Sequence, residues 1–210
     1  MKILLLSDIH GNAEALRAVM RAETDADATV FLGDALLSGP QANETLELLD
    51  ELKPSIAIRG NHDDDVLDPS GFRSWPAEWI ALNDWILADL DASAVAKIER
   101  FTDAGWYEFG GISAYLHHGD LGRRDLAALP DADEEVFNLL AGGTDAELVL
   151  FGHTHVQFTH KIGSRTFINP GSVGQPRCGV LHACYGVFED GVYEARLVRY
   201  DPAPWVAALD

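Results

Sequence analysis

The sequence has little positive charge, few cysteines and no long apolar run. Its 210 residues include 15 Lys and Arg against 34 Asp and Glu, which gives a formal net charge of −19 with neutral histidine. Such a surface repels polyanions, and no block rich in Lys or Arg interrupts it, so we expect neither an extended nucleic acid nor a membrane as a partner. The apolar run at residues 3–6 is far shorter than the ~20 residues that a bilayer span needs, and it lacks the flanks of a secretory signal.

The two cysteines, Cys178 and Cys184, do not have a spacing typical of a metal or redox motif. We therefore expect both to be reduced and the protein to be cytoplasmic. With 47% hydrophobic and 23% charged residues, the composition is that of a globular protein. The length predicts a single domain over residues 1–210.

Apolar and amphipathic segments alternate over the first sixty residues. Apolar runs at 2–7, 29–32 and 55–58 predict strands, and the spacing of apolar residues at 13–23 and 44–52 predicts helices. This alternation is typical of βαβ crossovers and a mainly parallel sheet. The C-terminal half predicts a second, largely antiparallel set of strands, with hairpins around Gly110-Gly111, Gly163-Ser164 and Asp190-Gly191.

Residues 64–104 carry no strand signal and contain three of the five tryptophans, so we expect a helical cap or insertion there. Apolar side chains recur at spacings of three or four, typical of a helix that begins near Pro76: Trp75, Trp79, Leu82, Ile86 and Leu90. We favour packing of this stripe on the domain body. The alternative is a flap over a site, in which Phe72, Trp75 or Trp85 would contact an aromatic or apolar part of a substrate.

Polar side chains next to glycine follow five of the predicted strands. The carboxyl ends of strands in an open α/β sheet line the crevice where ligands bind, so these side chains can converge. Two Asp, one Asn and four His form a set of donors without thiolates: Asp8, His10, Asp34, Asn61, His118, His153 and His155. The set suits Mn, Fe, Co, Ni or Zn, and seven donors suit two ions if one carboxylate bridges them. Taken singly, Asp34 or Asn61 fits a turn better than a ligand, so the prediction depends on the joint pattern.

These motifs resemble the calcineurin-like metallophosphoesterase superfamily. The matching blocks are Asp8-x-His10, Gly33-Asp34, Gly60-Asn61-His62-Asp63, His118-Gly119 and Gly152-His153-Thr154-His155. The segment 168–177 further resembles the small bacterial and archaeal phosphodiesterase branch. The resemblance implies an α/β fold, a four-layer α/β/β/α sandwich of two mixed sheets with a helical insertion after the Gly-Asn-His-Asp motif. It also implies two divalent ions, with Mn as the first expectation and Fe, Ni, Co or Zn as alternatives.

The resemblance further implies a role for each donor. Two groups would each hold one ion, with one carboxylate between them: Asp8, His10 and His155; Asn61, His118 and His153; and Asp34 as the bridge. His62 would lie outside the ligands and act as a general acid or stabilise the leaving group, and Asp63 would orient it. We prefer His118 to His117 as a ligand because the ligand of the family directly precedes a glycine.

Two residues are candidates for binding the substrate. Arg177 lies in a loop that the family places beside the metals, and its guanidinium suits a bidentate phosphate contact. Arg59 and the pair Arg123-Arg124 are alternatives that could equally pair with surface acids. Asn12 either contacts phosphate or caps the first helix, and the sequence supports both interpretations equally.

The resulting hypothesis is a dinuclear metal-dependent phosphoric ester hydrolase. It would cleave a phosphodiester, such as a small or cyclic nucleotide, by attack of a metal-bridging hydroxide. Hydrolysis of dinucleoside polyphosphates or phosphoproteins is the alternative within this class. A non-catalytic metal-binding scaffold, like the retromer subunit of the family, is the alternative from another class. Such a protein tends to lose the catalytic histidine or some ligands, whereas His62 and all seven donors are present here. An exposed face of the Trp-rich helix could also pair two chains.

Overall fold

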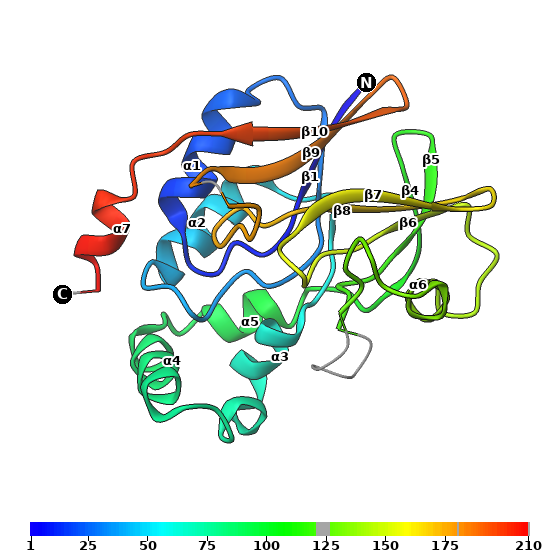
Figure 1. The fold of residues 1–210 in the computed structure, drawn as a ribbon. Helices are drawn as coiled ribbons and strands as arrows, with labels where there is room; N and C mark the ends of the chain where they lie inside the picture. Colours follow the sequence, from blue (N-terminus) through cyan, green and yellow to red (C-terminus); the bar gives the residue numbers. More distant parts are fainter. Residues whose placement is uncertain (121–126, 180, 210) are drawn as a thin grey trace.

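The computed structural model describes residues 1–120, 127–179 and 181–209 and contains two five-stranded sheets (Figure 1). The first has the order β10 (Val192–Val198), β9 (Ala183–Glu189), β1 (Lys2–Leu6), β2 (Ala28–Phe31) and β3 (Ile56–Ala57). The second has the order β4 (Gly105–Phe109), β5 (Ile112–Leu116), β6 (Leu148–Leu150), β8 (Arg165–Pro170) and β7 (Gln157–Ile162). Strand β1 is parallel to β2 and antiparallel to β9, and β6 is parallel to β5 and β8. Both sheets are therefore mixed, because β4 and β7 add antiparallel pairs to the second.

Alternate side chains of β1 face different layers. Leu4 and Leu6 belong to the core between the first sheet and its helices, whereas Ile3 and Leu5 belong to the core between the two sheets. All four are at most 1% exposed. A strand that is buried on both faces needs apolar residues at every position, which explains the unbroken apolar run in the sequence.

Helices cover the outer face of each sheet. The first sheet packs against α1 (Ala13–Ala22) and α2 (Ala42–Leu52), and the second against α6 (Glu134–Leu140). The order helix, sheet, sheet, helix confirms the predicted four-layer α/β/β/α sandwich. A short α7 (Ala203–Ala207), which we did not predict, follows β10. Among the described helices, none combines the length and the apolar character that crossing a bilayer requires.

The chain between β3 and β4 is helical. It forms α3 (Asn61–Leu67), a 3₁₀ turn (Pro69–Phe72), α4 (Ala77–Asp89) and α5 (Ala94–Ile98). The helix that begins after Pro76 confirms the prediction, whereas residues 61–63, which the sequence places directly after a strand, begin α3. Phe72 and Ile86 are buried in the core beneath the first sheet, whereas Trp79 is 44% and Trp85 47% exposed. The stripe therefore packs on the domain body through only some of its members, and a separate insertion over 64–104 stays a prediction.

Two loops at the carboxyl ends of the strands pack more closely than side chains would allow. A Cβ at Gly60 would contact Oδ1 of Asp34 and would lie 2.6 Å from its backbone nitrogen. At Gly105, which begins β4, the nearest contact would be an ordinary 3.6 Å to Cε2 of Tyr107. Gly60 therefore decides how closely the loop that carries Asp34 approaches the start of α3.

We predict that Gly60→Ala lowers the free energy of unfolding by ~1–3 kcal/mol, because the added methyl must displace a buried loop. Gly105→Ala is the matched control and should change that free energy by less than ~0.5 kcal/mol. Chemical denaturation followed by circular dichroism measures both variants. Equal stability of Gly60→Ala and the parent would contradict the packing described above.

Candidate metal centre

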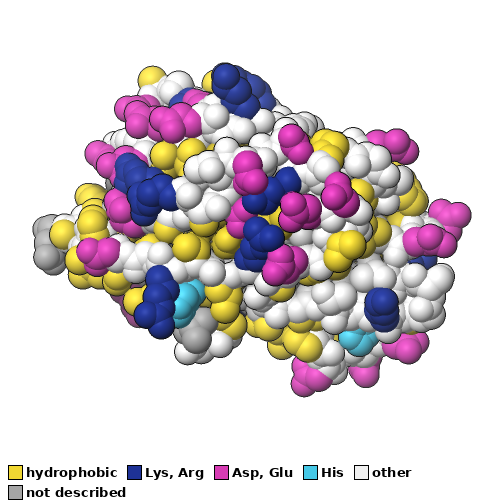
Figure 2. Space-filling model, turned by 90° about the horizontal axis from the view of Figure 1, so that it is seen from above, with side chains coloured by type: hydrophobic (Ala, Val, Ile, Leu, Met, Phe, Trp, Pro, Cys, Tyr) yellow, Lys and Arg dark blue, Asp and Glu magenta, His cyan; other side chains and the backbone are white. Residues whose placement is uncertain are grey.

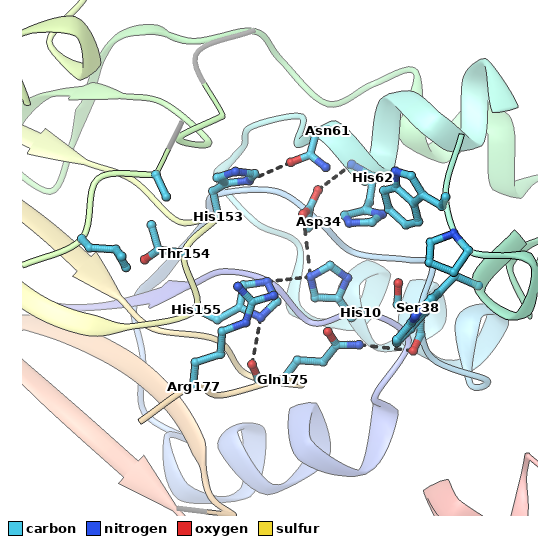
Figure 3. A pocket seen from close by; sticks show the side chains of 15 residues that line it. His10, Asp34, Ser38, Asn61, His62, His153, Thr154, His155, Gln175 and Arg177 are labelled. Carbon is cyan, nitrogen blue, oxygen red and sulfur yellow. Dashed lines mark hydrogen bonds and ion pairs between the residues drawn. The ribbon is translucent and has the colours of Figure 1, made fainter. Parts of the chain in front are cut away.

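The structure brings all seven predicted donors together, and five of them face one another in the close view of the pocket (Figure 3). In each of two groups, the donor atoms lie within 4.8 Å of one another: Asp8, His10 and His155 in the first triad, and Asp34, His118 and His153 in the second. Asn61 joins the second triad because its Oδ1 lies 2.8 Å from Nδ1 of His153. The donors come from the loops after β1, β2, β5 and β6 and from the first turn of α3.

Asp34 lies between the two triads. Its Oδ2 is 3.1 Å from Nε2 of His118 and 3.7 Å from Nε2 of His10. Its Oδ1 accepts a hydrogen bond from the backbone N–H of His62, at 2.8 Å, which ties the carboxylate to α3. Oδ2 thus faces histidines of both triads, while Oδ1 is held by the backbone of α3. This arrangement suits a bridging ligand.

The distances within the first triad fit a shared cation. Nε2 of His10 lies 3.1 Å from Nε2 of His155, which lies 3.3 Å from Oδ1 of Asp8. Two atoms bound to one ion cannot lie farther apart than twice a metal–ligand distance, about 4.2 Å. Within the described part of the chain, Oδ1 of Asp8 and Nε2 of His118 are buried without a hydrogen bond. Such atoms are costly to bury, and a cation would satisfy them.

Backbone carbonyls orient two of the histidine rings. Nδ1 of His118 lies 2.7 Å from the carbonyl oxygen of Leu32, and Nδ1 of His155 lies 2.8 Å from that of Gln175. A carbonyl oxygen can only accept, so each Nδ1 carries a proton and each Nε2 is left to face the pocket. Metal-binding histidines are commonly held in this way.

The charges in the pocket favour a positive charge at its centre. Burial opposes the ionisation of Asp8 and Asp34, but the neighbouring imidazoles outweigh it and hold the pKa of both carboxyls well below the usual range. Burial also opposes the charging of His118, but the Asp34 carboxylate raises the pKa of this histidine to about 10. Burial together with the charge on His118 lowers the pKa of His153 to about 4. The carboxylates thus hold a positive charge on an imidazole, and divalent ions would supply that charge instead.

Five of the seven donors have a left-handed backbone. Their φ angles lie between 50° and 67°: Asp8, His10, Asp34, His153 and His155. Residues other than glycine rarely adopt this conformation, and it concentrates at functional sites because the surrounding structure must enforce it. Here backbone hydrogen bonds enforce it, since the N–H of Asp8 donates to Gly33 at 2.9 Å and that of His10 to Asp34 at 3.1 Å.

His62 lies in the pocket beside the first triad. Its ring centroid is 5.0 Å from that of His10 and 5.3 Å from that of Trp75. A ring nitrogen of His62 also lies within 4.8 Å of the donor atoms of His10 and Asp34. The geometry therefore suits the predicted proton donor, and it also leaves His62 within reach of an ion.

Asp63 has a different task from the predicted one. We expected it to orient His62, but its carboxylate accepts hydrogen bonds of 2.8–2.9 Å from the backbone N–H groups of Asp34, Ala35 and Gly60. Burial and the charge on Asp34 raise the pKa of Asp63 to about 7, although the three N–H groups oppose this. Asp63 therefore fixes the backbone on either side of the site.

Asn12 caps α1, so one of its two interpretations is supported. Its Oδ1 accepts a hydrogen bond from the N–H of Ala15 at 3.0 Å, and its Nδ2 donates to the carbonyl of Gly174 and the hydroxyl of Tyr200. The residue is only 2% exposed. These contacts engage both the oxygen and the nitrogen of its amide within the fold, and the phosphate contact stays a prediction.

Arg177 lines the pocket, and its contact with phosphate stays a prediction. Its backbone N–H donates to the carbonyl of His155 at 3.1 Å, which holds its loop beside the first triad. Arg59 instead pairs with two acids, Asp64 at 2.9 Å and Asp103 at 2.6 Å. Arg123 and Arg124 lie outside the described residues.

The pocket has a volume of about 540 Å³ and includes residues that sequence reasoning missed: Ser38, Pro76, Trp79, Leu129, Thr154 and Gln175. Of the three aromatic residues proposed for a flap, Trp75 lines the pocket and Phe72 is fully buried. Trp85 is not among the described lining residues. The spacing of the stripe had included Trp79, but it could not tell which tryptophan faces a cavity.

Comparisons with known proteins agree with this geometry. The family model described as "Calcineurin-like phosphoesterase superfamily domain" matches residues 1–189. The phosphodiesterase YfcE of Escherichia coli (strain K12) is 28% identical over 204 residues, which cover 91% of this chain and 89% of that protein. A metallophosphoesterase structure from Sphaerobacter thermophilus has a TM-score of 0.81 at 27% identity and covers 100% of this chain and 92% of that one. The structure of protein PH1004 from Pyrococcus horikoshii OT3 shares the fold, with a TM-score of 0.86, 16% identity and coverage of 99% and 92%. The chain therefore belongs to the calcineurin-like phosphoesterase superfamily.

Proposed function

We propose that the protein hydrolyses a small phosphodiester with the help of two divalent ions. The observation that carries the proposal is the pair of triads with Asp34 between them, on one side of a single pocket. Two divalent ions bound there would act as Lewis acids on phosphoryl oxygens and would lower the pKa of an attacking water. Mn is our first expectation, and Fe, Co, Ni and Zn are alternatives because the same donors suit all of them.

Residues of the chain would supply the remaining parts of the reaction. His62 would donate a proton to the leaving oxygen, since it lies in the pocket beside the first triad. Arg177, on the same pocket, would contact phosphoryl oxygens through its guanidinium. Asp34 would stay ionised throughout, because its pKa lies well below the usual range.

Several observations favour a small diester over other substrates. The name of the Escherichia coli relative, a phosphodiesterase, supports a diester. On the face in Figure 2, Lys and Arg are interspersed with Asp and Glu, so this face does not offer an extended nucleic acid a continuous basic surface. Hydrolysis of dinucleoside polyphosphates or phosphoproteins remains the alternative. We also propose a cytoplasmic location, since the spacing of the two cysteines is not typical of a metal or redox motif.

Metal reconstitution tests the proposal. We expect a metal-stripped sample to be inactive, and we expect at least one of Mn, Ni, Zn and Mg to restore hydrolysis of bis(p-nitrophenyl) phosphate above that of p-nitrophenyl phosphate. Release of p-nitrophenolate measures both reactions. Preference for the monoester would favour the phosphatase alternative, and inactivity on both substrates with every ion would favour the non-catalytic scaffold.

Replacement of the bridging carboxylate should remove metal and activity together. We expect Asp34→Asn to bind fewer than two ions per chain and to lose more than about 100-fold in activity, since even partners of metal ligands contribute up to that much. Elemental analysis after dialysis and the diesterase assay measure the two effects. Asp25→Asn is the control, because Asp25 is exposed and pairs with Lys2. Full metal content in Asp34→Asn would show that Asp34 is not a bridge.

His62→Ala separates a proton donor from a ligand. If His62 is a proton donor, the His62→Ala variant should still bind two ions per chain and should hydrolyse the diester about 100-fold more slowly. The loss should be larger for an alkyl than for a p-nitrophenyl leaving group, because the alkoxide needs the proton more. His160→Gln, at a histidine that stacks on Phe137, is the control. A missing ion in His62→Ala would make His62 a ligand, and unchanged activity would remove its role.

A further inference from the structure

The lining of the pocket combines polar and apolar side chains. Besides the candidate ligands, it includes three apolar residues of the segment that leads into and begins α4, Trp75, Pro76 and Trp79, which we call the apolar wall. Trp79 is 44% exposed, so this wall holds apolar surface that the fold leaves uncovered. An apolar wall beside convergent polar groups is typical of a site that buries the organic part of a ligand.

The helix that carries Trp79 is anchored beside the pocket. Asn83 lies four residues later on α4, so both side chains share one face of the helix. Asn83 is fully buried, and its Oδ1 accepts a hydrogen bond from the N–H of Ser38 at 3.0 Å. The carbonyl of Ser38 in turn accepts one from Nε2 of Gln175 at 3.2 Å. Asn83 thus anchors the helix that carries Trp79 to a polar rim of the same pocket.

The apolar wall begins beside the group proposed to protonate the leaving oxygen. The rings of Trp75 and His62 meet edge to face, with centroids 5.3 Å apart and an interplanar angle of 73°. In the close view, His62 and Asp34 lie side by side on the pocket (Figure 3). The organic part of a leaving group on the His62 side would therefore lie next to the tryptophans.

We infer that this wall binds a planar aromatic ring of the substrate, such as an aryl group or a nucleobase, and that Trp79 stacks against it. The inference rests on the proposed function for the position of the phosphoryl group and goes beyond it in naming the organic group. A volume of about 540 Å³ accommodates a phosphoryl group and a ring together. Trp79 is thus a specificity-determining residue, since a flat ring gains a stacking contact that a small alkyl group does not.

A pair of stable ligands isolates the ring from the phosphoryl group. Phenylphosphonate and methylphosphonate share the same anionic head, resist hydrolysis and differ only in the organic group. Isothermal titration of the Mn-loaded full chain should show tighter binding of phenylphosphonate. Trp79→Ala should weaken the binding of phenylphosphonate by about tenfold and that of methylphosphonate by less than about twofold. Trp79→Phe should retain most of the preference and shows that the site is intact.

Trp85 provides the matched control. It lies on the same helix and is 47% exposed, against 44% for Trp79, but it is not among the described residues that line the pocket. Trp85→Ala should therefore leave the binding of both phosphonates unchanged. Thermal denaturation of each variant establishes that it is folded.

Three outcomes would overturn the inference. Equal affinity of the parent for the two phosphonates would exclude the aromatic subsite, and so would equal weakening of both by Trp79→Ala. Diesterase activity measured in the same sample would then leave the proposed function supported. Failure of both to bind, together with inactivity on bis(p-nitrophenyl) phosphate, would refute the two proposals together. Gel filtration could show that Trp79→Ala converts a dimer into a monomer while phosphonate binding is unchanged. That result would assign the apolar wall to a contact between two copies of the chain.

Discussion

The burial of two carboxylates among imidazoles is the constraint on which the site depends. Asp8 and Asp34 are 0% and 1% exposed, so the charge of each must be compensated locally. The compensation comes from histidines that follow three different strands, β1, β5 and β6, and from one histidine on α3. The strained backbone of the loops that carry the donors must itself be held in place. The surrounding hydrogen bonds, such as the three that Asp63 accepts, therefore hold backbone rather than substrate.

The same constraint explains why the fold was more predictable than the details of the site. The layers follow from which residues are apolar, because a strand buried on both faces and an amphipathic helix leave direct traces in the sequence. The start of α3 left no such trace. The helix begins with three polar residues that follow a glycine, Asn61, His62 and Asp63, a pattern typical of a loop. The first turn is fixed by hydrogen bonds from the N–H of Gly60 to Asp63 and from the N–H of His62 to Asp34.

The convergence of the seven donors was predictable because it depends on residue type and on position at strand ends. The tasks of Asn12 and Asp63 were not, since each depends on partners that only the fold brings near. Asn12 bonds to Gly174 and Tyr200, which are 162 and 188 residues away. A capping asparagine and a phosphate-binding asparagine look identical in the sequence, and long-range contacts alone distinguish them.

Chemistry and selectivity are carried by different parts of this chain. The candidate ligands lie mostly on the loops that follow β1, β2, β5 and β6, and Asp34 faces donors of both triads. The apolar wall lies largely on the helical segment before and within α4, which reaches the site through one hydrogen bond between Asn83 and Ser38 and through packing of Phe72 and Ile86. Substitutions on the exposed face of that segment leave the donors untouched. The fold can therefore change which organic group it accepts without rebuilding the charged centre, and that separation follows from where strain and burial are concentrated.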